Sequence, residues 1–212
     1  FKKFNIKVKY IYNPFDKSLI NNKILYSKKD KFFQKETLNL ISVSRLTNQK
    51  DHLTLLESLR FVNLKLKPRL MIIGKGKNLS RLKNYTNVHN LKQIVKFTGY
   101  LNNPYGNILN SKIVILTSKF EGLPNILIEA QYLKKYIIST DCPTGPKEIL
   151  LNGLAGELIK VGDSKRLASL INNYYSNRKN NFKKINKGTE YFNRFDYKIN
   201  CKKYLHFVIN NF

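Results

Sequence analysis

Short runs of apolar residues alternate along the chain with stretches in which apolar residues recur every three or four positions. A short continuous apolar run is typical of a strand that is buried on both faces, and recurrence every three or four residues is typical of an amphipathic helix. The apolar runs predict strands at 8–12, 38–43, 69–73, 94–97, 113–116, 136–139 and 157–161.

Helical spacing follows most of these runs. After Asp51, which we expect to cap a helix, Leu55, Leu59 and Val62 share one helix face. The pattern also predicts a basic helix around 79–82 and further helical segments at 104–109, 124–133, 146–151 and 163–175. Strands that each lead into a helix predict an α/β fold with a doubly wound parallel sheet. In such a sheet ligands bind beyond the carboxyl ends of the strands, so the turns after strands are where chemistry is expected.

The charge balance is strongly basic. The 212 residues include 39 Lys and Arg against 13 Asp and Glu, which gives a formal net charge of +26. Such a charge attracts polyanions, but the aromatic residues lie mostly in the Lys- and Asn-rich flanks instead of alternating with basic residues on a sheet face. We therefore expect no nucleic-acid partner, and an anionic lipid surface suits the charge at least as well.

Three residue patterns exclude other classes. No stretch is long and apolar enough to span a bilayer, and the opening residues lack the apolar run of a signal peptide. Cys142 and Cys201 lie far apart without neighbours at ligand spacing, which predicts reduced cytosolic thiols and no metal site. His52, His89 and His206 have no carboxylate or Cys partner nearby in the sequence, so we expect them to be solvated or capping residues.

Two cations follow the strand at 38–43. The strand brings Arg45 to its carboxyl end, and a short loop brings Lys50 close to it. An Arg fork and a mobile Lys charge suit a diphosphate, whereas the alternative is two solvated surface cations. After the strand at 69–73, Gly74 and Gly76 supply only two of the three glycines of a dinucleotide-binding turn, so a tight structural turn is favoured over a hydride-transfer site.

The segment from Glu121 to Glu129 is the most informative. Glu121 stands just before a predicted helix and Glu129 lies inside it, and Pro124 suits a first helical turn. The amides of Gly122, Leu123, Asn125 and Ile126 at this helix start form an anion site. Two carboxylates beside an anion site suit hydrogen bonds to sugar hydroxyls, whereas the alternative is a helix cap and an outward Glu. The turn at 139–148 adds Asp141 and Glu148, as ligand contacts or as caps of a rigid turn.

Five motifs in this order resemble the family-4 retaining glycosyltransferases of the GT-B fold. They are Asn13-Pro14-Phe15-Asp16, the run from Ser42 to Lys50, Ile73-Gly74-Lys75-Gly76, the Glu121 to Glu129 element, and the turn from Thr140 to Leu150. The resemblance implies that 1–195 is the Rossmann-like, nucleotide-sugar-binding C-terminal half of such an enzyme, with the interdomain linker entering near 13–16. It also implies that 196–212 is the final helix and that an N-terminal acceptor domain precedes this chain.

The resemblance further implies roles for individual residues. Glu121 would contact the donor sugar, Glu129 the ribose, and Arg45 and Lys50 the phosphates. Base contacts would come from the turn that holds Tyr100 and Leu101. The donor would be a UDP-sugar or GDP-sugar, with no further cofactor and no metal. We name no protein nucleophile.

The same resemblance predicts partners and location. The acceptor would be a saccharide or a lipid-linked saccharide in surface polysaccharide or lipopolysaccharide synthesis, and the protein cytoplasmic or peripheral on the inner face of the cytoplasmic membrane. This chain alone is expected to bind donor without turnover. Ser44 departs from the family, which commonly has Gly before the Arg. A nucleotide-sugar epimerase of the same fold and a polyanion-binding module remain the alternatives.

Overall fold

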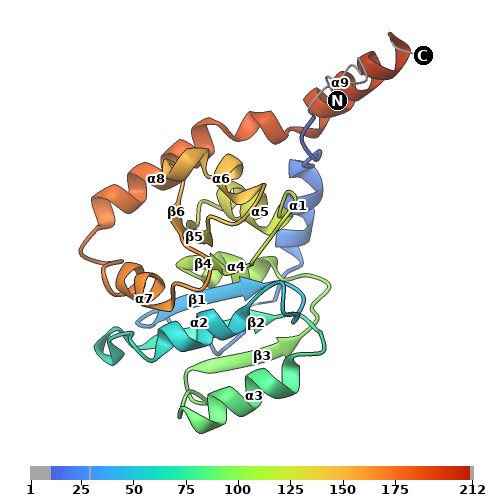
Figure 1. The fold of residues 1–212 in the computed structure, drawn as a ribbon. Helices are drawn as coiled ribbons and strands as arrows, with labels where there is room; N and C mark the ends of the chain where they lie inside the picture. The colour runs from blue at the N-terminus through green and yellow to red at the C-terminus, as the bar shows by residue number, and fades with distance from the viewer. Residues whose placement is uncertain (1–10, 29, 211–212) are drawn as a thin grey trace, which may run out of the picture.

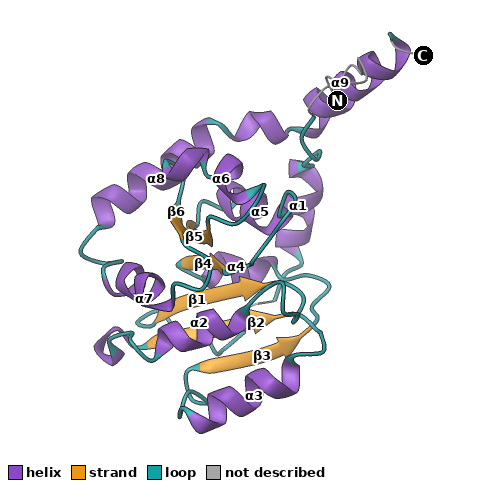
Figure 2. Ribbon diagram, in the orientation of Figure 1, coloured by secondary structure: helices purple, strands orange, loops and turns teal. Residues whose placement is uncertain are grey.

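A six-stranded parallel sheet, with strand order β3-β2-β1-β4-β5-β6, forms the centre of the computed structural model, which describes residues 11–28 and 30–210 (Figures 1 and 2). All five strand pairs are parallel. The strands are β1 (Leu38–Val43), β2 (Pro68–Ile73), β3 (Val95–Gly99), β4 (Ile113–Leu116), β5 (Tyr136–Thr140) and β6 (Glu157–Ile159). The predicted doubly wound α/β fold is confirmed.

Helices connect the strands and cover both faces of the sheet (Figure 2). The helices are α1 (Lys17–Leu25), α2 (His52–Leu59), α3 (Leu79–Val88), α4 (Tyr105–Asn110), α5 (Asn125–Tyr132), α6 (Pro146–Ile149), α7 (Ser164–Asn172), α8 (Arg178–Glu190) and α9 (Tyr197–Ile209). Short 3-10 turns are η2 (Leu64–Leu66), η3 (Leu151–Gly153) and η4 (Phe192–Phe195).

Two apolar cores, one on each face, explain why the strands show no polar alternation. Leu40 and Leu70 pack on the side of α2, α3 and α7. Their chain neighbours Ile41 and Met71 point to the other side, where α1, α4 and α5 pack. Because side chains alternate across a sheet, a strand covered on both faces is apolar at most positions and lacks the alternation of a half-exposed strand.

Three sequence predictions need correction. Of the strand predicted at 8–12, residues 8–10 lie outside the described residues, and Ile11 and Tyr12 are in no strand. Asp51 occupies the N-cap position of α2, but its carboxylate accepts a hydrogen bond from the Thr54 hydroxyl, at 2.8 Å, and none from a helix amide. Helices α1 and α8 lie in polar segments for which the apolar pattern predicts no helix.

The segments before α1 and before α9 lie side by side. The Phe15 amide donates to the Phe195 carbonyl at 2.7 Å, and the Tyr197 amide donates to the Phe15 carbonyl at 3.1 Å. From this point α9 leads away from the sheet (Figure 1). The motif at 13–16, which the resemblance assigns to a linker, therefore pairs with the start of the last helix.

Candidate functional site

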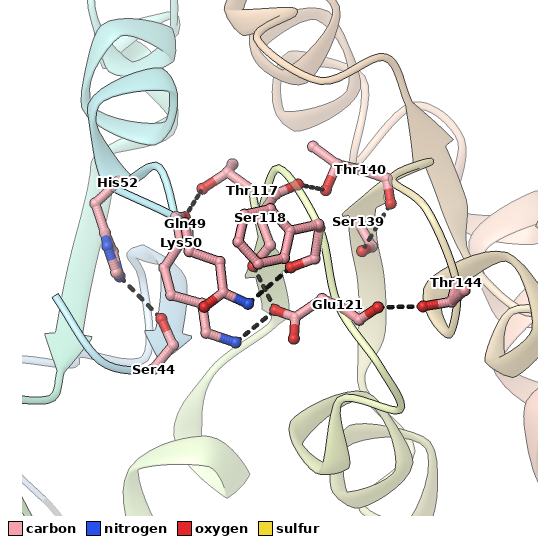
Figure 3. A network of polar contacts seen from close by, with 11 residues as sticks. Ser44, Gln49, Lys50, His52, Thr117, Ser118, Glu121, Ser139, Thr140 and Thr144 are labelled. Atoms are coloured by element: carbon pink, nitrogen blue, oxygen red, sulfur yellow. Dashed lines mark hydrogen bonds and ion pairs between the residues drawn. The ribbon is translucent and has the colours of Figure 1, made fainter. Parts of the chain in front are cut away.

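The site lies where the direction of strand succession reverses, between β1 and β4. At this point the loops that follow the two strands diverge, and they leave room for a ligand beyond the carboxyl ends. Polar contacts join the loops after β1, β4 and β5 into one network (Figure 3). The turns in which the sequence predicts the chemistry therefore lie close together at one edge of the sheet.

Side-chain to backbone bonds hold the three loops together. The Thr117 hydroxyl lies 3.1 and 3.0 Å from the carbonyl oxygens of Lys50 and Asp51. The Gln49 amide donates to the Phe120 carbonyl at 2.9 Å, and the Thr140 hydroxyl donates to the Ser118 carbonyl at 2.5 Å (Figure 3). These bonds hold the loop backbones in place before any ligand binds, which is what a preorganised site requires.

An ion pair forms the centre of this network. Lys50 Nζ lies 2.5 Å from Glu121 Oε1, and the two side chains are only 14% and 7% exposed. Ser118 Oγ donates to the same carboxylate oxygen at 2.5 Å (Figure 3). The sequence predicts Lys50 as a phosphate contact and Glu121 as a sugar contact, and the structure adds that the two side chains bind each other. Because the pair is withdrawn from water, removing either partner leaves a costly unpaired charge.

Arg45 and the double-glycine turn lie at the edge of this network. Arg45 is exposed at the carboxyl end of β1. The Ser44 amide donates to Ile73 at 3.0 Å and the Leu46 amide donates to Lys75 at 2.9 Å, so the loops after β1 and β2 are hydrogen bonded. A Cβ atom at Gly74 would overlap the Ser44 carbonyl oxygen. This close approach supports the interpretation of the glycines as a tight structural turn.

The start of α5 is adjacent to the ion pair. Pro124 is its N-cap, one position earlier than the expected first-turn position, and Gly122, Leu123, Asn125 and Ile126 surround it. The first amides of a helix have no partner within the helix, so they carry partial positive charge. Gly145 packs against the Gly122 carbonyl without space for a Cβ atom, which holds the turn after β5 against this helix start.

Glu129 lies inside α5, half-buried. It accepts a hydrogen bond from the Tyr105 hydroxyl of α4. Burial raises the pKa of Glu129, while the Tyr105 bond and the charge of Lys23 act in the opposite direction. The sequence predicts Glu129 as a ribose contact, and its hydrogen bond to Tyr105 is a further contact that local spacing does not predict.

His52 contradicts the sequence prediction. It is 2% exposed, at the first position of α2, and its Nε2 lies 3.1 Å from Ser44 Oγ (Figure 3). Burial, and to a smaller extent the nearby charge of Lys50, lowers the pKa of His52 to about 4. His89 follows the expectation as the C-cap residue of α3, and His206 is exposed on α9.

The remaining candidate residues lie around the same loops. Tyr100 is 65% exposed and Leu101 is half-buried, both just after β3. Glu148 accepts a hydrogen bond from the Tyr12 hydroxyl at 2.8 Å, and Asp141 pairs with Lys147 at 3.6 Å. Glu148 thereby ties the segment before α1 to the turn after β5.

The described residues contain neither a metal-binding cluster nor a membrane-spanning helix. Within 11–28 and 30–210, no group of three or more His, Cys, Asp or Glu side chains is placed to hold a metal ion. In the same ranges no helix has the length and apolar character that crossing a membrane requires. Cys142 and Cys201 are both free thiols.

Comparison with known proteins gives one family. The model of the family described as glycosyl transferases group 1 matches residues 25–191. An uncharacterized glycosyltransferase of Methanocaldococcus jannaschii is 38% identical over 117 residues, which are 55% of this chain and 29% of that protein. A Campylobacter jejuni N-acetylgalactosaminyltransferase, named for a diphospho-undecaprenol-linked acceptor, is 29% identical over 163 residues, 76% of this chain and 42% of that protein. The chain therefore spans less than half the length of these curated relatives.

The solved structures show the same fold. The crystal structure of HepE of Anabaena in complex with UDP superposes with a TM-score of 0.82 at 21% identity. The superposition covers 95% of this chain and 57% of that one. At this identity the similarity establishes the α/β Rossmann-like fold.

Proposed function

Because this chain belongs to the glycosyl transferases group 1 family, we propose that it binds a nucleoside diphosphate sugar beyond the carboxyl ends of β1, β4 and β5. In the full-length protein this half would present the donor for transfer of its sugar to a saccharide or lipid-linked acceptor. The comparisons favour neither the epimerase nor the nucleic-acid-binding alternative.

The observation that carries this proposal is the buried ion pair at the start of α5. Lys50 and Glu121 meet at 2.5 Å beside the first amides of a helix, with Arg45 exposed at the neighbouring strand end. Cations and helix amides suit a diphosphate, while a carboxylate does not. A ligand that has both a diphosphate and hydroxyl groups satisfies all of these groups at once.

In this proposal each site residue binds a different part of the donor. When donor binds, Lys50 and Arg45 neutralise the charge that develops on the departing nucleoside diphosphate, without a metal ion. Glu121 accepts hydrogen bonds from sugar hydroxyls, Glu129 from the ribose, and Tyr100 and Leu101 contact the base. Transfer proceeds with retention of configuration. Nuclear magnetic resonance of the product of the full-length protein tests retention, and added chelator tests independence of metal.

Isothermal titration of this chain with UDP tests the site. We expect binding by the parent and a loss of at least about a hundredfold in affinity for Arg45→Ala/Lys50→Ala, since each of the two changes removes a charge-assisted contact of about 1.5–3 kcal/mol. Lys83→Ala/Lys92→Ala is the matched control, because it removes the same net charge from exposed positions away from the network. If the two double variants bind UDP equally well, the site is assigned wrongly.

We further propose that the protein contacts an anionic membrane surface. The net charge is +26, and α8 carries exposed Arg178, Lys179 and Lys183 around Phe182, whose side chain is 63% exposed. An exposed aromatic ring among cations suits the boundary between lipid head groups and acyl chains. Attachment of this kind would be peripheral and would place the enzyme at the inner face of the cytoplasmic membrane.

Cosedimentation with vesicles tests this attachment. We expect binding to anionic vesicles at low salt, loss at high salt, and none to neutral vesicles. Lys179→Glu/Lys183→Glu should weaken binding more than the matched pair Lys83→Glu/Lys92→Glu on the side of α3. Equal effects of the two pairs would assign the attraction to overall charge and remove α8 from the proposal, and no binding at low salt would remove the membrane partner.

A further inference from the structure

Ser44 and His52 form a pair that the proposed donor contacts do not use. Ser44 follows β1 directly, next to Arg45, and is half-buried, whereas only 2% of the surface of His52 is exposed. His52 Nε2 is 3.1 Å from Ser44 Oγ (Figure 3). His52 Nδ1 is buried and has no hydrogen-bond partner among the described residues.

The unpartnered Nδ1 determines which ring nitrogen carries the proton. A buried N–H without an acceptor is rarer in proteins than a buried acceptor without a donor. The neutral tautomer with hydrogen on Nε2 avoids a buried N–H without an acceptor. The ring is neutral near pH 7, because burial lowers the pKa of His52 to about 4. Nε2 therefore donates its hydrogen to Ser44 Oγ, and Ser44 Oγ acts as the acceptor.

This direction leaves the Ser44 hydroxyl hydrogen available. Among the described residues, no hydrogen bond from Ser44 Oγ to another group accompanies the contact with His52. The backbone of Ser44 is held by its bond to Ile73 at 3.0 Å and by the close approach of Gly74. The hydroxyl therefore has a fixed position next to Arg45, at the carboxyl end of a central strand.

We propose that Ser44 is a diphosphate-binding residue of the donor site and that His52 is its positioning residue, which holds the hydroxyl as a donor to a phosphate oxygen. The inference rests on the proposed function and assigns a further contact within that site. A hydroxyl whose oxygen already accepts a hydrogen bond is a better donor to an anionic oxygen, because hydrogen bonds in a chain polarise one another.

Titrations of the full chain with UDP and with uridine test the pair. Four variants are compared with the parent: Ser44→Ala, His52→Leu, His52→Gln and Ser44→Ala/His52→Leu. Ser44→Ala should bind UDP about tenfold more weakly, the loss for one hydrogen bond to a charged group, and uridine as the parent does. His52→Leu should show the same split between the probes. The double variant should be no weaker than Ser44→Ala. His52→Gln, whose side-chain amide also donates, should retain most of the affinity for UDP.

Three results overturn the inference. Ser44→Ala that binds UDP as the parent does would show that the hydroxyl does not contact phosphate. His52 would have a structural role only if His52→Leu lost the same affinity for UDP as for uridine, and if this loss added in full to the loss of affinity in Ser44→Ala. A parent chain that binds no UDP would instead refute the proposed function, and the inference with it. Ser44→Ala removes a single oxygen, so it keeps the test decisive even if His52→Leu does not fold.

Discussion

The buried imidazole of His52 should make the folded state sensitive to mild acid. In the unfolded chain the ring has its ordinary pKa of 6.5, whereas in the folded chain burial and the charge of Lys50 lower the pKa to about 4. At pH values between these two pKa values the imidazole is mostly protonated in the unfolded state and mostly neutral in the folded state. The free energy of unfolding therefore falls as pH decreases from about 6.5 towards 4, and it is regained as pH rises.

The size of the effect follows from the shift. At about 1.36 kcal/mol for each pKa unit, a shift from 6.5 to about 4 amounts to roughly 3 kcal/mol, reached once pH is below 4. At pH 5 the unfolded imidazole is almost fully protonated and the folded one is almost fully neutral. We therefore expect a loss of about 2 kcal/mol between pH 7.5 and pH 5. This is a large fraction of the stability of an ordinary domain.

Urea denaturation at several pH values, in parent and in His52→Gln, measures the effect. Gln does not titrate, so the difference between the two curves isolates His52 from groups that both chains share. One shared group is Glu129, whose raised pKa acts in the opposite sense over part of the range. Relative to that of His52→Gln, the free energy of unfolding of the parent should fall by about 2 kcal/mol as pH falls from 7.5 to 5. Parallel curves would show that the folded imidazole takes up a proton as readily as the unfolded one.

Three further predictions concern the loops around the ion pair. Glu129→Gln should weaken the binding of bare UDP, whereas Glu121→Gln should leave UDP binding unchanged and weaken only the binding of the sugar-bearing donor. Titration of both variants with UDP and with UDP-glucose checks this, and equal losses for both ligands would refute it. Lys50→Met should lower the free energy of unfolding by about 3 kcal/mol, because it leaves the Glu121 carboxylate unpaired and only 7% exposed. In urea denaturation the Lys50→Met/Glu121→Gln variant should be more stable than the sum of the two single changes implies, and strict additivity would contradict the pairing. Gly74→Ala should reduce both the melting temperature and UDP affinity, because its Cβ would overlap the Ser44 carbonyl, and a parent-like variant would show that the turn relaxes without affecting the site.

The sheet could be predicted well from the sequence because its strands are covered on both faces. The bounds of β1 and β4 match the predicted 38–43 and 113–116, since burial on both faces makes both strands largely apolar. Helix α2 was predictable because Leu55 and Leu59 mark a single buried face. Where packing on both faces of an element requires apolar residues, the pattern of apolar residues in the sequence is sufficient to predict that element.

Helices α1 and α8 show where pattern fails. Among the described residues, α1 buries only Ile20, and α8 buries only Asn181 and Gly188. Neither helix therefore carries an apolar stripe. Asp16 starts α1 by accepting from the Ser18 and Leu19 amides, which is a capping signal that polar composition alone obscures.

The sequence predicts that Lys50 and Glu121 lie at the same edge of the sheet, but it does not predict their contacts. Lys50 and Glu121 each follow a strand, which marks both as site residues, but their direct pairing links positions 71 apart in sequence. His52 departs from the prediction because its burial comes from tertiary packing and its partner Ser44 lies across a loop. Local spacing reports neither fact.

The pairing of Phe15 with the chain around Asp196 forms a joint between the segment before α1 and the start of α9. A movement of α9 therefore also acts on the segment before α1. Just before Phe15, the Asn13 amide donates to Asn125 at the start of α5 at 3.3 Å, and the Tyr12 hydroxyl reaches Glu148. A rotation at this joint must either carry those contacts along or break them. The joint thus connects α9 to the start of α5 and to α6.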